Sequence, residues 1–143
     1  MTHTTRYLLA ILLLALGLRL IVSLSQSTDV YAGTGGDSGW YLANGLGFLS
    51  GREHGQIRGV NFYISTIPTA PLYLIFVGTW QTFLSDDAAI HAIRIAQSLM
   101  STATVFFAFR LALTLSQDRR VGLMAALALE LHPVFIADSG HIM

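Results

Sequence analysis

The first long apolar run constrains this chain more than any other feature. Residues 7–24 (YLLAILLLALGLRLIVSL) contain a single charge, Arg19. Eighteen helical residues come close to covering the hydrocarbon core of a bilayer, which is about 30 Å thick. The run therefore predicts a membrane-spanning helix, and Arg6 just before it favours a cytoplasmic N-terminus. A cleaved signal peptide is the alternative, because Ser23 to Ser25 has the small residues of a cleavage site.

The composition supports a membrane protein. The chain has 143 residues, of which 53% are hydrophobic and only 11% charged, whereas soluble domains carry about a quarter charged residues. It contains no cysteine, so disulfides and cysteine-based zinc or redox sites are excluded. The net charge is zero and no basic stripe follows the chain, so the sequence predicts no nucleic-acid partner.

A polar, glycine-rich interval follows the first run over 25–70. Within it we expect a short helix over about 38–50, with Asp37 as its N-cap. Trp40 and Tyr41 lie in its first turn, and three leucines recur at helical spacing along one face: Leu42, Leu46 and Leu49. Such a helix suits the boundary between water and lipid, so we predict that it lies along the membrane surface.

Three further apolar segments complete the predicted all-α membrane architecture. Segment 71–84 is short for a span and is typical of an interfacial or re-entrant helix, whereas 88–116 and 121–137 are long enough to cross. If 71–84 crosses alone, Arg119 and Arg120 lie outside, against the positive-inside tendency. We prefer the alternative, in which 71–84 only dips into the outer leaflet and both arginines are cytoplasmic.

Several motifs in order resemble one family. An arginine-containing first span (LGLRLIV) precedes an acid followed by aromatics (DSGWYLANGLGFLSG), a Pro-Leu-Tyr start of the next segment (TAPLYLIF) and an arginine-glutamine stretch (IRIAQSLMSTATVFFAFRLAL). An arginine pair and a small-residue span ending in proline (GLMAALALELHPVFIADSGHIM) follow. From about Arg6 onward the chain resembles the N-terminal part of GT-C superfamily glycosyltransferases, the polytopic group that includes protein O-mannosyltransferases and lipid A aminoarabinose transferases.

The resemblance implies a function and a set of site residues. It implies transfer of a sugar from a polyprenyl-phosphate donor to a lipid, glycan or protein acceptor at the outer membrane face, with Asp37 as general base or acceptor-positioning acid. It also places Tyr41 and Tyr73 among the substrate-binding residues. Where many relatives carry a second acid, this chain has Ser38. A carboxylate at that boundary suits the chemistry, because the attacking hydroxyl or amine must lose a proton.

A cation is expected to stabilise the polyprenyl-phosphate leaving group. Arginine binds phosphate oxygens through two parallel hydrogen bonds, and Arg94, with Gln97 nearby on the same helix, is the first candidate. Arg52 and Arg58 are second choices. In the alternative interpretation, Arg94 extends to lipid headgroups or pairs with one of the two acids that begin the helix, Asp86 and Asp87.

The remaining ionisable residues indicate no metal site. Glu130 lies in an apolar run, where it is either a site acid or the partner of Arg110 or of helices outside this chain. No two of the histidines have the helical spacing of a metal motif; those considered are His91, His132 and His141, together with Asp138. We therefore expect no cofactor.

Three spans are too few to enclose a lipid-linked sugar and its acceptor, so we expect this chain to be a fragment of a longer enzyme and to be inactive alone. We expect that enzyme in a bacterial or archaeal plasma membrane, with its active site on the extracytoplasmic face. Two other classes stay open. A small membrane scaffold or assembly subunit would leave Asp37 and Arg94 without a role. A transporter fragment would need broken helices and polar groups in mid-membrane, at which Glu130 and Pro133 hint.

Overall fold

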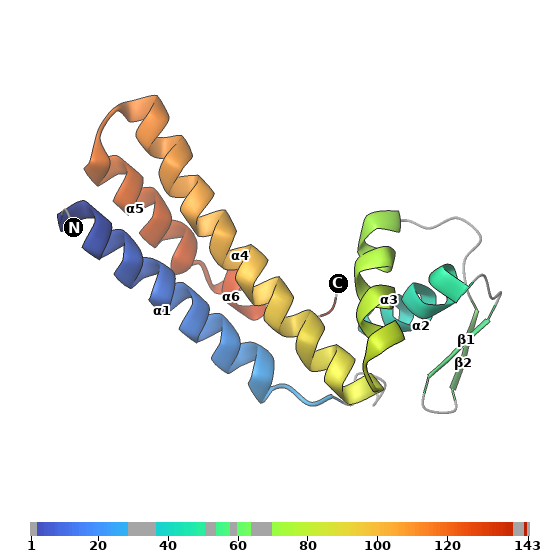
Figure 1. Cartoon of the computed structure of the whole chain (residues 1–143). Helices are drawn as coiled ribbons and strands as arrows, with labels where there is room; N and C mark the ends of the chain where they lie inside the picture. Colours follow the sequence, from blue (N-terminus) through green and yellow to red (C-terminus); the bar gives the residue numbers. More distant parts are fainter. Residues whose placement is uncertain are drawn as a thin grey trace. The chain divides into compact units, whose positions relative to one another are not determined.

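The structure is a computed structural model, and it describes residues 3–28, 37–50, 54–57, 60–63, 70–138 and 142. Side chains are described for 3–28, 38–49, 70–138 and 142. The described part is predominantly helical, as the sequence predicts (Figure 1). It divides into two compact units: the α1 unit comprises 1–26 and 94–141, and the α2 unit comprises 27–93 and 142–143.

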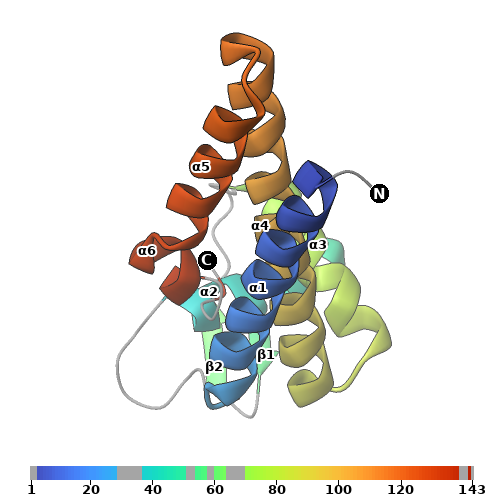
Figure 2. The ribbon, with the colours of Figure 1, turned by 90° about the vertical axis from the view of Figure 1, so that its left-hand side faces the viewer.

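Helix α1 (His3–Ser25) contains the predicted span 7–24 and extends it at both ends. Helix α4 (Asp86–Ser116) has no glycine or proline to interrupt it, and two acids in its first turn complement the helix dipole. Of the described helices, α1 and α4 are the two that are long and apolar enough to cross a membrane. In the α1 unit, α1 and the C-terminal part of α4 lie side by side (Figures 1 and 2).

A tight turn joins α4 to α5 (Arg119–Glu130). Gln117 has a φ of 57° and its N–H donates to the carbonyl of Leu113 at 2.9 Å, which is the left-handed cap that often ends a helix. The Asp118 carboxylate then accepts from the N–H of Arg120 at 2.8 Å and caps α5. Since both helix ends are satisfied locally, α4 and α5 form a defined helical hairpin.

The predicted span over 121–137 is not one helix. Helix α5 ends at Glu130, and α6 (Pro133–Asp138) begins after Leu131 and His132. Proline at 133 has no N–H to continue the α5 hydrogen bonds and its ring would clash with the preceding turn, but it fits the first position of a new helix. The predicted segment 121–137 is therefore divided between two helices, and the break follows from Pro133.

In the α2 unit, α2 (Asp37–Ser50) is followed by a short antiparallel hairpin and then by α3 (Pro71–Phe83). Strand β1 (His54–Ile57) pairs with β2 (Val60–Tyr63), His54 opposite Tyr63. The hairpin lies in the interval 25–70, for which the sequence predicted only a helix. The hydrophobic core of this unit joins α2, α3 and the start of α4, with Leu42, Val77, Ile90 and Ile93 buried.

Candidate functional site

Two glycines let α2 and α3 touch through their backbones. A Cβ on Gly78 would lie 2.3 Å from the carbonyl oxygen of Gly45, and a Cβ on Gly45 would lie 2.9 Å from the backbone nitrogen of Gly78. No side chain fits at such a separation, so both positions require glycine. The low helix propensity of glycine would favour an interruption of α2 at Gly45, but the helix continues through it. Gly45 instead determines where α2 meets α3.

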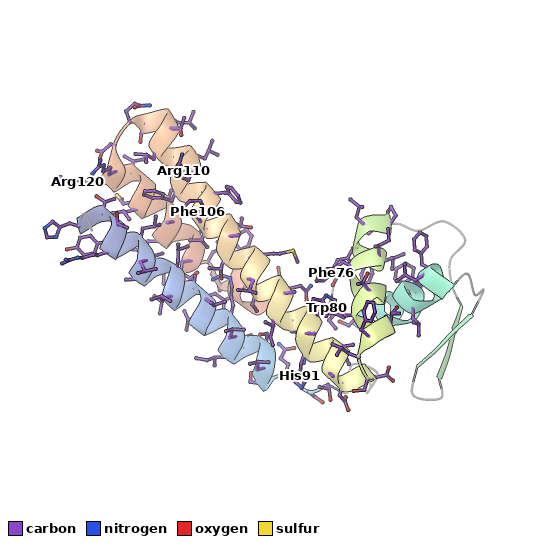
Figure 3. All side chains as sticks on the ribbon, in the orientation of Figure 1. Phe76, Trp80, His91, Phe106, Arg110 and Arg120 are labelled. Atoms are coloured by element: carbon purple, nitrogen blue, oxygen red, sulfur yellow. The ribbon has the colours of Figure 1, made fainter. Side chains whose placement is uncertain are left out.

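A row of aromatic rings lines the same pair of helices. The rings of Trp40 and Tyr41 meet edge to face at a centroid distance of 5.1 Å, and Tyr41 meets Tyr73 at 5.0 Å. On α3 the row continues from Tyr73 to Phe76 at 6.0 Å and on to Trp80 at 6.4 Å; Figure 3 labels the last two. All of these contacts are edge to face except the tilted pair of Tyr73 and Phe76, and an edge-to-face contact stabilises by about 0.5–1.5 kcal/mol. The predicted site residues Tyr41 and Tyr73 are thus in direct contact.

Asp37 is the first residue of α2, one helical turn ahead of Tyr41. Its side chain lies outside the described residues, so its catalytic role stays a prediction. The next residue, Ser38, donates its hydroxyl to the carbonyl of Ile142 at 2.8 Å. Ser38 thus ties the start of α2 to a late part of the chain.

Arg94 belongs to the α1 unit, where it is nearly fully buried, with 2% of its surface exposed. Its Nη1 donates to the carbonyl of Gln26 at 3.0 Å. Gln26 follows the last turn of α1, where a cation is favourable to the helix dipole and to the final carbonyls. Gln97 is half-buried one turn further along α4. In this arrangement a phosphate reaches Arg94 only if its contact with α1 opens.

An ion pair inside the α1 unit is the main feature that the sequence analysis missed. Nη1 of Arg19 donates to Oε2 of Glu130, and both side chains are fully buried. Arg19 also donates from Nε to the hydroxyl of Ser101 at 2.9 Å and from Nη1 to the carbonyl of Ala15 at 3.1 Å. The other oxygen of Glu130, Oε1, is buried and has no hydrogen-bond partner among the described residues.

The prediction that Arg110 is the partner of Glu130 within the chain is therefore wrong. Arg110 is exposed on α4, whereas Arg19 on α1 is the residue that Glu130 contacts. The available signal was that one acid and one base each interrupt an apolar run, since such residues usually face one another in a bundle. The spacing of 111 residues between them gives no local clue to the pairing.

Polar contacts also set the register of α1 against α4. Gln26 contacts Arg94, Ser23 contacts Ser98 with 3.3 Å between the hydroxyl oxygens, and Arg19 contacts Ser101. As the α1 number falls the α4 number rises, so the two helices run antiparallel. Contacts recur at every helical turn, which places them in one row along the interface.

The structure does not gather all the predicted site residues in one unit. Tyr41 and Tyr73 lie in the α2 unit together with the backbone of Asp37, whereas Arg94 and Gln97 lie in the α1 unit. Arg52, Arg58 and His141 lie outside the described residues. No group of three or more histidine and acidic side chains suited to a metal ion occurs in the described part of the chain. His91 is half-buried there, with no hydrogen-bond partner for its Nδ1 among the described residues.

Comparisons with known proteins give no relative for this chain: no protein-family model, no curated protein and no solved structure matches it.

Proposed function

We propose that the chain is part of a membrane glycosyltransferase of the GT-C type, with α1 and α4 crossing the bilayer and the N-terminus in the cytoplasm. The sugar donor is a polyprenyl-phosphate sugar, and the acceptor is a lipid, glycan or protein. The reaction takes place at the extracytoplasmic face of a plasma membrane. The proposal builds on the order of motifs along the chain and on the local geometry around Asp37.

One observation carries the proposal: Asp37 is the first residue of a helix that is firmly positioned. Helix α2 is held to α3 by the backbone contact of Gly45 with Gly78 and by the ring contact of Tyr41 with Tyr73. A general base must be held at a fixed distance from the proton that it removes. The position of Asp37 at the start of such a helix, one turn from Tyr41, supports its assignment as that base.

The proposed step is a single displacement at the anomeric carbon. The acceptor oxygen or nitrogen forms a bond to C1 of the sugar while the bond from C1 to the phosphate oxygen breaks. The acceptor proton passes to the Asp37 carboxylate, and the electron pair of the broken bond leaves with polyprenyl phosphate. Tyr41 and Tyr73 bind the substrate, since tyrosine combines an apolar ring with a hydroxyl.

Arg94 and Gln97 keep their proposed place at the phosphate. The Arg94 guanidinium donates to the carbonyl of Gln26. Engagement of a phosphate by Arg94 would have to compete with that contact. In the proposal, donor binding is therefore linked to the position of the C-terminal end of α1.

The transporter alternative has one observation in its favour, namely the buried pair of Arg19 and Glu130 next to the break between α5 and α6. We favour the transferase because the two charges neutralise each other. A paired arginine and glutamate leave no net charge with which to bind an ionic cargo. A pure scaffold would give no role to Asp37.

Replacement of the acid tests the transferase. Proteoliposomes that contain the longer enzyme, of which this chain is proposed to be a part, are supplied with radiolabelled polyprenyl-phosphate sugars, and transfer to acceptor is counted. Asp37→Asn is expected to slow transfer by about 10²-fold to 10⁴-fold, the usual contribution of a general base. Asp86→Asn, an exposed acid at the start of α4, serves as the matched control. Transfer by Asp37→Asn at the wild-type rate, or none by the wild type, would contradict the proposal.

A further inference from the structure

An open groove lies on the exposed side of α4 within the α1 unit. It is shallow, because all its lining residues come from one stretch of this helix, between Thr104 and Thr114. Its walls are mainly apolar, with Phe106, Phe107 and Leu111 among them. Phe107 and Leu111 are among the more exposed large hydrophobic residues of the described chain, at 65% and 62%. The groove therefore offers an apolar surface that nothing within the described chain covers.

A single cation interrupts this apolar surface. Arg110 lines the groove and is exposed, and no carboxylate among the described residues pairs with it. It precedes the end of α4 at Ser116 by six residues, which is about 9 Å along a helix axis. An arginine at this depth extends toward the headgroups of a bilayer while its methylene groups stay in the hydrocarbon.

The same end of the α1 unit is basic. Arg119 begins α5 and lines a small cavity together with Thr4 and Thr5 of the first turn of α1, so Arg6 and Arg120 belong to this end as well. Figure 3 labels Arg110 and Arg120 there. The acid of this region, Asp118, uses its carboxylate to cap α5. A basic helix end of this kind attracts anionic lipid headgroups.

We propose that this groove binds an anionic phospholipid. The Arg110 guanidinium holds the lipid phosphate through charge-assisted hydrogen bonds, and an acyl chain lies against Phe107 and Leu111. The alternative occupant is an acidic transmembrane helix. A lipid suits the groove better, because its phosphate lies at the headgroup level that the Arg110 guanidinium reaches, while its acyl chain lies at the level of the apolar residues. The inference depends on membrane insertion of α4 and not on the transferase proposal.

Native mass spectrometry of the full chain released from detergent micelles tests the inference. Phosphatidylglycerol and phosphatidylcholine with identical acyl chains are offered in equal amounts. The wild type is expected to retain phosphatidylglycerol about fivefold to tenfold better than phosphatidylcholine, the effect of one hydrogen-bonded charge. Arg110→Gln is expected to remove the preference. Arg120→Gln removes a charge of the same basic end but lies outside the groove, so as the matched control it is expected to keep most of the preference.

Two further measurements separate the sources of the signal. Arg110→Lys keeps the charge and is expected to keep most of the preference for phosphatidylglycerol. Thermal unfolding of each variant is also recorded, so that loss of the preference in Arg110→Gln through misfolding is distinguished from loss of the charge. An excess of inorganic phosphate is expected to leave the bound phosphatidylglycerol in place. Four results would each overturn the proposal: equal retention of both lipids by the wild type, an equal loss in Arg120→Gln, displacement of lipid by free phosphate, or a change of oligomeric mass in Arg110→Gln.

Discussion

The α1 unit and the α2 unit are both built from apolar helices, but different contacts hold the helices in place. In the α1 unit the specific contacts are polar: a buried ion pair and a row of hydroxyl and carbonyl groups. In the α2 unit they are contacts of shape: two glycine backbones that touch, flanked by aromatic rings that meet edge to face. Helices that pack only through apolar surface can do so in many registers, so each unit needs a second kind of contact to select one register.

The largest expected effect comes from breaking the ion pair. Glu130→Ala leaves the Arg19 charge buried without a carboxylate and is expected to lower the free energy of unfolding by about 3–5 kcal/mol. The measurement is unfolding in mixed micelles by titration with a denaturing detergent, followed by circular dichroism.

Two controls sharpen this result. Arg6→Ala removes an exposed charge from the same helix as Arg19 and is expected to stay within about 0.5 kcal/mol of the wild type. The exchange Arg19→Glu with Glu130→Arg is expected to recover part of the loss, because opposite charges face each other again. A loss below about 1 kcal/mol in Glu130→Ala would mean that apolar packing alone holds the α1 unit.

A smaller effect is expected where the α2 unit depends on shape. Gly78→Ala places a methyl group against the Gly45 carbonyl, and this overpacking is expected to cost about 1–3 kcal/mol. The two tryptophans of the chain, Trp40 and Trp80, both lie in this unit, so fluorescence monitors its unfolding selectively.

Gly17 of α1 is the matched control, because a Cβ there meets nothing within 4 Å. Gly17→Ala is expected to raise stability by about 0.5–1 kcal/mol through better helix propensity. If Gly78→Ala behaved like Gly17→Ala, the contact between the two glycines would not determine how α2 meets α3.

The smallest effect is expected in the polar row of the α1 unit. Ser98→Ala removes one hydroxyl contact, that with Ser23, and is expected to cost about 0.6 kcal/mol, the average for such bonds between membrane helices. Ser101→Ala is expected to cost more, since Ser101 accepts from a charged donor. Equal costs for the two variants, in the same micelle unfolding experiment, would show that the charge of Arg19 adds nothing at Ser101.

The sequence predicted the helices well where local signals mark them. Helix α2 begins one residue before the predicted range, and α3 begins at the predicted residue, because Asp37 and Pro71 are residues that favour helix starts. Helix α4 begins two residues early. The end of α5 was not predicted, although Pro133 is the residue that causes it. The hairpin of β1 and β2 was not predicted because its strands have no strong alternating pattern.

Contacts between distant residues were beyond prediction for a physical reason. Whether Glu130 meets Arg19 or Arg110 depends on how three helices rotate and slide against one another, which no local pattern specifies. The same holds for Arg94: its arginine chemistry is readable from the sequence, but its burial against Gln26 depends on where α1 ends. The contact of Tyr41 with Tyr73 likewise depends on the glycine crossing.

The row of contacts between α1 and α4 repeats at each helical turn, so it would also accept a slip. If α1 moved by one turn, about 5.4 Å, Arg19 would come opposite Ser98 and Ser23 opposite Arg94, and hydrogen bonds would still form. The serines and arginines alone are thus compatible with two registers of α1 against α4. Glu130 selects between these registers, because Arg19 lies within reach of the Glu130 carboxylate in only one of them. A single carboxylate on α5 therefore determines how α1 and α4 align.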